Sequence, residues 1–128
     1  EEICARALDV GSQNHARLGL IHVVEPIIID PVYDVVPVVP AELELEMVKQ
    51  SRKELNRLGD RLGVPPDRCW VESGVTKTAI LQKAQEQQVD LIVVGSHGRR
   101  GVGLLLGSTA NAVLHGANCD VLAVRVAA

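Results

Sequence analysis

The stretch from Asp90 to Val126, DLIVVGSHGRRGVGLLLGSTANAVLHGANCDVLAVRV, decides the fold class. Two apolar runs of strand length, DLIVVG and DVLAVRV, enclose a glycine-rich segment and a helical stretch from about Ser108 to His115. Two strands joined through a helix form a βαβ unit, in which the strands are parallel and the crossover is right-handed. The stretch therefore predicts an α/β protein.

The rest of the chain repeats this alternation. Apolar spacing predicts helices over 1–13, 41–62 and 77–88, and short apolar runs predict strands over 17–24 and 68–72. The helix over 41–62 has the clearest pattern, and its apolar stripe consists of Leu43, Met47, Leu55, Leu58 and Leu62. The segment 25–42 contains four prolines and is expected to be a long irregular crossover. A competing hypothesis makes Cys4–Val10 an edge strand instead of part of a helix.

Composition excludes several classes of function. The net charge is −3 and aromatic residues make up 2% of the 128 residues, which argues against a nucleic-acid-binding surface. Three cysteines without a C-x-x-C pair indicate neither a disulfide framework nor a zinc site, and they are typical of a reducing cytosol. No apolar run reaches the roughly 18 residues of a membrane span, so no membrane partner is expected.

The glycine-rich segment follows a predicted strand and precedes a predicted helix. In open α/β sheets ligands bind beyond the carboxyl ends of the strands, where backbone N–H groups are free. Gly95, Gly98 and Gly107 allow the backbone to approach a ligand closely, and Ser108 and Thr109 lie where the helix dipole is positive. This arrangement predicts an anion site suited to phosphate. The simpler alternative is a flexible loop followed by a capped helix.

Other residues near this segment have two interpretations each. His97 could donate to a phosphate, although a loop histidine is more often solvated. Arg99 and Arg100 could neutralise phosphate charge or simply solvate the loop. His22 is expected to be a buried strand histidine, and Cys69 and Cys119 are expected to be small core residues. Neither a P-loop nor a dinucleotide fingerprint is present.

Nearly the whole chain resembles the universal stress protein family. The segment VDLIVVGSHGRRGVGLLLGSTANAVLHGANCDVLAVRV is similar to the C-terminal half of these proteins, and ARLGLIHVVEP and WVESG resemble their second and third strands. Nucleotide-binding members carry G-x-x-G, nine further residues and then G-[ST]. The resemblance implies that Gly95, Gly98, Gly107 and Ser108 surround the ribose and triphosphate of ATP, with Mg²⁺ present only with the nucleotide.

The resemblance also implies a fold and further contacts. The fold is a doubly wound, open, parallel five-stranded sheet of order 3-2-1-4-5 with helices on both faces, formed by residues 1–128 as a single domain. The first strand, with an acidic residue that contacts adenine, is apparently missing from the chain. Val23 is expected to touch the adenine ring, and the protein is expected to be a homodimer through its last strand, Val121 to Val126.

One difference from the family's nucleotide-binding motif supports a second hypothesis for the function. The spacer over 99–106 has eight residues instead of nine, which resembles the branch of the family that has lost ATP binding. The first hypothesis is therefore a cytoplasmic, dimeric stress-response module that binds ATP or a related adenine nucleotide. The second is an interaction module of the same fold without nucleotide. No nucleophile with a positioned base is visible, so no catalytic residue is assigned, and any ATP hydrolysis or autophosphorylation would be slow.

Overall fold

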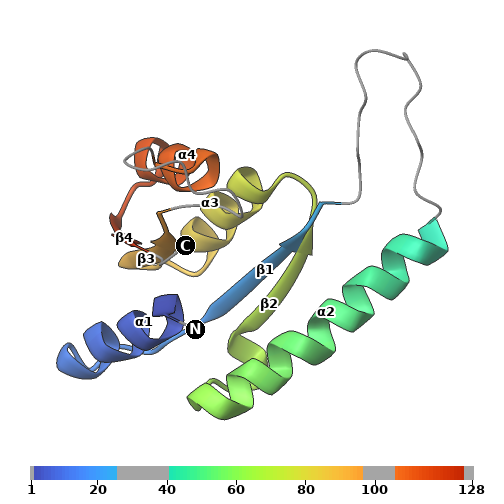
Figure 1. Ribbon diagram of the computed structural model, residues 1–128, viewed down its shortest axis with the longest axis horizontal. Coiled ribbons are helices and arrows are strands. Elements are labelled where there is room, and N and C mark those ends of the chain that lie inside the picture. The colour runs from blue at the N-terminus through green and yellow to red at the C-terminus, as the bar shows by residue number, and fades with distance from the viewer. Residues whose placement is uncertain (1, 26–40, 97–105, 126–128) are drawn as a thin grey trace. The chain divides into compact units, whose positions relative to one another are not determined.

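The computed structural model describes residues 2–25, 41–96 and 106–125, in which helices and strands alternate (Figure 1). The described elements are, in chain order, α1 (Glu2–Gln13), β1 (Leu20–Val24), α2 (Ala41–Leu62), the short 3₁₀ helix η1 (Pro66–Arg68), β2 (Cys69–Ser73), α3 (Thr76–Glu86), β3 (Leu91–Gly95), α4 (Ser108–Gly116) and β4 (Asp120–Val124). The chain divides into two compact units, Gly19–Thr76 and Glu1–Leu18 with Lys77–Ala128.

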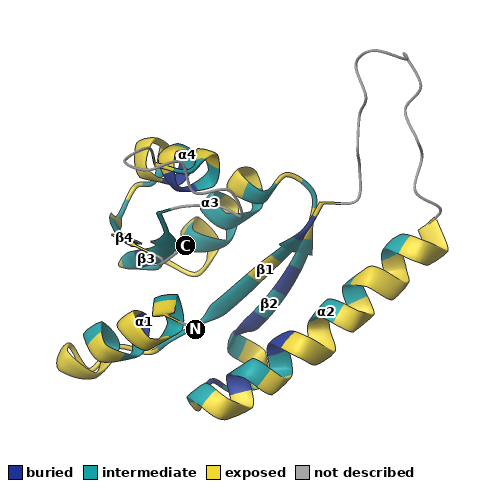
Figure 2. Ribbon diagram, in the orientation of Figure 1, coloured by how far each residue is buried: buried dark blue, intermediate teal, exposed yellow. Residues whose placement is uncertain are grey.

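The unit Gly19–Thr76 is a parallel strand pair with one long helix. β1 and β2 pair from Leu20 opposite Cys69 to Val24 opposite Ser73, and α2 packs against both strands (Figure 1). Figure 2 shows that α2 turns its buried positions to one side and leaves the opposite side exposed. The apolar core of this unit consists of Val24, Leu55, Val64, Cys69 and Val71.

Two glycines explain why α2 ends where it does. Gly63 has a φ of +74°, a left-handed conformation that glycine adopts without steric cost. The N–H of Val64 donates to the carbonyl of Gly59 at 2.8 Å, which is the long bond of a Schellman motif. Val64 thereby returns to the core, where it is 3% exposed, and the chain continues through two prolines into β2.

The amino-terminal half of α2 departs from the predicted stripe. Leu55 is buried as expected, but Leu43 is 52% exposed and Met47 is 38% exposed. The prediction that they continue the buried face is wrong. Over this half of the helix the side that faces the strands is occupied by Glu44 and Val48, which are half-buried. Ser73, the last residue of β2, donates from its hydroxyl to the Glu44 carboxylate at 2.6 Å.

The other unit contains the second parallel pair. β3 and β4 pair from Leu91 opposite Asp120 to Gly95 opposite Val124. α1 packs against both strands and α4 packs against β4. The core of this unit is formed by Ala7, Ile92, Ala110, Val113 and Val124, of which Val113 has no exposed surface.

Most elements expected from the sequence are confirmed, with boundaries that move by a few residues. The helix over 1–13 is confirmed as α1, so the alternative of an edge strand over Cys4–Val10 is wrong. The predicted helices over 41–62 and 77–88 correspond to α2 and α3, and the parallel pairing of the strands is confirmed. The proline-rich crossover lies largely outside the described residues. In the described part of the chain, no helix is both long and apolar enough to cross a membrane.

The prediction that His22 is buried is wrong. The sequence predicts a buried histidine in a strand covered on both faces, but His22 is exposed and the first residues of β1 are only half-buried. The described part of its unit supplies a single long helix, α2, for the two strands. One helix covers one face of a strand pair, so positions within β1 stay accessible to water.

Candidate functional site

Two backbone hydrogen bonds fix the ends of the glycine-rich segment. Ser96 follows β3, and its N–H donates to the carbonyl of Val124 at 2.8 Å, one step beyond the β3–β4 register. The carbonyl of Ser96 accepts the N–H of Gly107 at 2.6 Å. The residue before α4 is thus tied directly to the residue after β3. This clip places the first turn of α4 at the carboxyl end of the strand pair.

The first turn of α4 has free donors. Gly107 is extended, with φ −61° and ψ 155°, and no side chain in the described part of the chain caps the helix. The first bond of the helix runs from the Asn111 N–H to the Gly107 carbonyl at 2.8 Å. The N–H groups of Ser108, Thr109 and Ala110 precede that bond, and within the described ranges none of them has an acceptor. Together with the helix dipole they favour an anion.

Ser96 also contributes a buried hydroxyl. Its Oγ is buried, and no hydrogen-bond partner for it is found in the part of the chain that the structure describes. A buried polar group without a partner is costly, and such groups in native proteins usually mark a bound water, ion or ligand. Ser96 is not among the site residues predicted from the sequence. Its position as the first polar residue after an apolar strand is the signal that could have found it.

The structure brings only part of the predicted site together. Gly95 directly precedes Ser96, Gly107 is hydrogen-bonded to the Ser96 carbonyl, and both glycines are half-buried. Ser108 is exposed on the first turn of α4. Thr109 is half-buried on the same turn. Val23 is half-buried near the end of β1, in the other unit. The predicted contacts His97, Gly98 and Arg99 lie outside the described residues.

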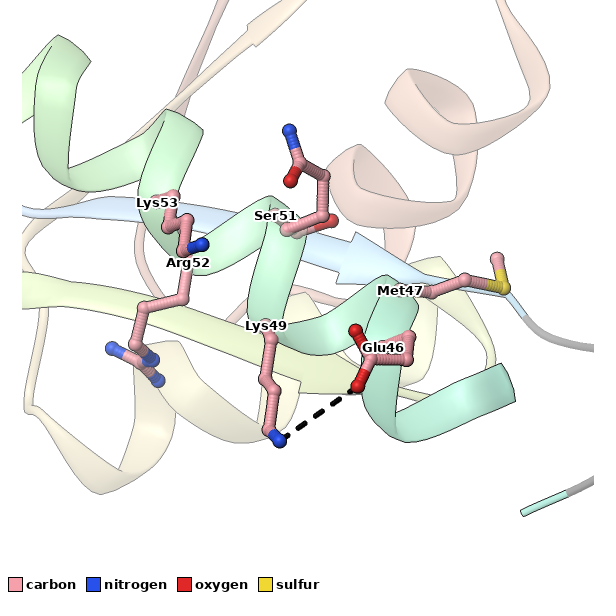
Figure 3. A pocket seen from close by; sticks show the side chains of 7 residues that line it. Glu46, Met47, Lys49, Ser51, Arg52 and Lys53 are labelled. Atoms are coloured by element: carbon pink, nitrogen blue, oxygen red, sulfur yellow. Dashed lines mark ion pairs between the residues drawn. The ribbon is translucent and has the colours of Figure 1, made fainter. Parts of the chain in front are cut away.

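Two hollows of the described surface lie on α2. One of about 650 Å³ is lined by residues 46, 47 and 49–53 of α2, and none of the predicted nucleotide contacts belongs to it (Figure 3). Its side chains project from the exposed side of one helix, and a hollow on a single helix encloses little of any small molecule. Within the described ranges no group of three or more histidine, cysteine or acidic side chains could hold a metal ion.

Comparison with known proteins identifies the family. The model of the universal stress protein family matches residues 1–125. The chain belongs to the universal stress protein family. It is 43% identical over 123 residues to universal stress protein A homolog 2 of Coxiella burnetii, covering 94% of this chain and 82% of that protein.

Solved structures show the same fold. The universal stress protein UspA from Lactobacillus plantarum superimposes with a TM-score of 0.73 at 23% identity, covering 96% of this chain and 87% of that one. A universal stress protein in complex with cAMP superimposes with a TM-score of 0.62 at 22% identity, covering 98% of this chain and 88% of that one. Because both identities are low, these two likenesses concern the fold alone.

In this universal stress protein, a glutamate that sequence reasoning missed binds the start of α3. Glu25 directly follows β1, and one of its carboxylate oxygens accepts the N–H of Thr76 at 2.9 Å and the Thr76 hydroxyl at 2.6 Å. The hydroxyl bond, followed by the N–H bond, lowers the pKa of Glu25 below its ordinary value of 4.5. The contact is exposed and joins positions 51 residues apart.

A pH profile tests this contact. Because the pKa of Glu25 is lowered on folding, its contribution to stability is present above pH 4.5 and is lost as the pH falls through the lower folded value. We therefore expect Glu25→Gln to lose less stability than the wild type between neutral pH and about pH 3, measured by urea denaturation. Asp9→Asn, at an exposed carboxylate of α1, is the control and should keep the wild-type profile. Identical profiles for Glu25→Gln and the wild type would contradict the assignment.

Two of the three cysteines, Cys69 and Cys119, behave as packing residues. Cys69 is 2% exposed and Cys119 is half-buried, and burial raises the pKa of both thiols above the ordinary value of 9.0. A raised pKa leaves little reactive thiolate at neutral pH. The interpretation of Cys69 as a core residue is confirmed, whereas Cys119 reaches the surface in part.

Proposed function

We propose that this chain is a stress-response module that binds ATP or a related adenine nucleotide, with the phosphates at the first turn of α4. The observation that carries the proposal is the clip between Ser96 and Gly107. It joins the residue that carries a buried hydroxyl to the residue before α4, and among the described residues neither this hydroxyl nor the first three N–H groups of α4 have a partner. Such a set of donors complements phosphate oxygens. A related fold has been solved in complex with cAMP, which supports an adenine nucleotide as the ligand class.

The remaining contacts in this proposal come from the family resemblance. Gly95 and Gly98 would lie against the ribose and phosphates, His97 and Arg99 would be further phosphate contacts, and Val23 would touch adenine. Mg²⁺ would arrive with the nucleotide. The proposal includes a single domain over residues 1–128 whose strands, in the family's numbering, have the order 3-2-1-4-5. In that numbering β1 and β2 of this chain would be strands 2 and 3, and β3 and β4 would be strands 4 and 5. Strand 1 of that order has no counterpart among β1 to β4.

We further propose a cytoplasmic homodimer formed through the last strand. β4 pairs with β3 along one edge, and among the described residues no strand pairs with its other edge. An open strand edge is a template for pairing with a second chain, and a two-fold axis would close it. Arg125, exposed directly after β4, would restrict that pairing to specific partners.

A direct binding measurement tests the proposed function. Protein freed of bound ligand is dialysed to equilibrium against ATP with Mg²⁺ and, separately, against cAMP. We expect binding of ATP with a dissociation constant of about 1 mM or tighter, because charge-assisted bonds to several N–H groups are each worth about 1.5 kcal/mol or more. Absence of ATP binding up to millimolar concentration would contradict the proposal.

The second candidate is an interaction module of the same fold that holds no nucleotide. The eight-residue spacer over 99–106 favours it, because one residue fewer changes how the segment can surround a triphosphate. The dialysis experiment separates the two candidates.

A further inference from the structure

The exposed side of α2 is divided by charge. Residues 41–48 contain three glutamates and no cation, and residues 49–62 contain five cations and two acids. The two segments therefore carry net charges of −3 and +3. An excess of acids at the amino end and bases at the carboxyl end suits the helix dipole, but the dipole acts only over the first and last turns. The separation here extends along the whole helix.

Seven of these charged residues form one exposed face, which we call the charged face of α2. Residues three and four apart lie side by side on a helix. The face consists of Glu42, Glu46, Lys49, Lys53, Arg57, Asp60 and Arg61, all of them exposed. The fifth cation, Arg52, lies beside it and donates a guanidinium N–H to the carbonyl of Cys69 at 3.1 Å.

The charges of this face are only slightly neutralised within the chain. Lys49 lies 3.8 Å from Glu46, and their side chains are 60% and 71% exposed (Figure 3). Within the described residues, Lys53, Arg57 and Arg61 have no ion pair. The strongest cationic part of the helix is thus available for an external partner.

The sequence of the face is complementary to itself when reversed. If a second copy of α2 lies antiparallel about a two-fold axis midway between Ser51 and Arg52, Glu42 falls opposite Arg61 and Glu46 falls opposite Arg57. The same register places Lys53 opposite Gln50, one turn from Glu46, and all three are exposed. The two-fold axis repeats each of these pairs. A parallel copy in register would instead place like charges opposite each other.

Apolar side chains flank the same contact. Leu43 and Leu45 are 52% and 54% exposed, and Met47 is 38% exposed. We propose that α2 is a self-docking surface, on which the helix of a second copy packs antiparallel with the acidic half of each helix against the basic half of the other. The occupant is a second copy because the complementarity is internal to this one helix. This interface is separate from the proposed β4 dimer.

The expected strength follows from the exposure of the pairs. Solvent-exposed ion pairs contribute roughly 0–1 kcal/mol each, so the association should be weak and should depend strongly on salt. At low ionic strength we expect the average mass in solution to rise toward that of the associated species as the protein concentration increases. Its dissociation constant should rise by about tenfold or more at 0.5 M NaCl, where the screening length is only a few ångströms.

Charge exchange tests the register by sedimentation velocity. Glu46→Arg and Arg57→Glu should each weaken the association by about tenfold, since each places like charges opposite each other twice. The double variant Glu46→Arg/Arg57→Glu restores the pairing and should associate as the wild type does. Lys77→Glu, at an exposed residue of α3, is the matched charge-reversal control and should leave the association unchanged. Circular dichroism confirms that each variant is folded.

A carbodiimide cross-link locates the contact. In a mixture of ¹⁴N- and ¹⁵N-labelled protein, we expect a mixed-label peptide pair joining Lys53 of one copy to Glu46 of the other. The proposal is overturned if the wild type shows no association that salt weakens, or if the double variant fails to regain it. It is equally overturned if only the cation reversal matters, because that result indicates that the basic half of α2 binds an acidic surface of the second copy outside α2.

Discussion

Replacing Gly59 by valine is expected to lower the free energy of unfolding by about 3 kcal/mol, near the upper end of the cost of overpacking a core. A Cβ on Gly59 would lie 2.8 Å from the Cys69 Sγ and 2.8 Å from the Val64 carbonyl oxygen. Both neighbours are fixed, because Cys69 is 2% exposed and Val64 closes the Schellman turn on Gly59 itself. The helix cannot move away without breaking its contact with β2.

Gly11→Val is the matched control. Gly11 also lies within a helix, α1, but the nearest atom to a Cβ there is the Ala16 carbonyl oxygen at 4.0 Å. Valine has a higher helix propensity than glycine by a few tenths of a kcal/mol, so this variant should be as stable as the wild type or slightly more so. Urea denaturation followed by far-UV circular dichroism measures both. Equal stability of the two variants would show that α2 does not approach β2 as closely as described.

Ser108→Glu is expected to weaken ATP binding by tenfold or more, which corresponds to about 1.4 kcal/mol. The carboxylate would occupy the free N–H groups of the first turn of α4 and repel the phosphates. A negative charge at a helix amino terminus stabilises the helix, so the fold should be unaffected. Dialysis against ATP with Mg²⁺ gives the affinity, and a thermal melt confirms that the variant is folded.

Two further variants separate charge from side-chain loss. Ser108→Ala should retain most of the binding, because the backbone N–H groups are proposed to carry it. Asn111→Glu places the same charge on an exposed position one turn further along α4, beyond the first hydrogen bond of the helix, and should weaken binding less than Ser108→Glu does. Equal losses in Ser108→Glu and Asn111→Glu would indicate a general charge effect instead of a site at the first turn.

Much of the fold could be predicted because its signals are local. The period of apolar residues and the Gly63 stop predict α2 with its observed bounds, Ala41–Leu62. Burial depends on which elements are neighbours in space, and a single sequence does not report that. Leu43 and Met47 fit the helical period, but Glu44 and Val48 occupy the side of this half of α2 that faces the strands, so Leu43 and Met47 are exposed. His22 is exposed for a related reason, since strand composition alone does not tell how many helices cover a sheet.

The features of the candidate site that depend on residue type could be predicted from the sequence. Glycines and a serine between a strand and a helix indicate free backbone donors, and α4 begins at Ser108 as expected. The clip between Ser96 and Gly107 could not be predicted, because it joins residues on either side of a long segment through main-chain groups that every sequence has. The bond from Thr76 to Glu25 was missed likewise, since it joins residues far apart in the sequence.

Amide chemical shifts test the central claim most directly. In ¹⁵N-labelled protein titrated with ATP and Mg²⁺, the N–H groups of Ser108, Thr109 and Ala110 should move more than those elsewhere in α4 and than any in α2. The amide of Gly107, which is bound to the Ser96 carbonyl, should respond less than these three. Saturable shifts confined to that turn are the predicted result. Shifts centred elsewhere, or none up to millimolar ATP, would contradict the proposal that the first turn of α4 holds the phosphates.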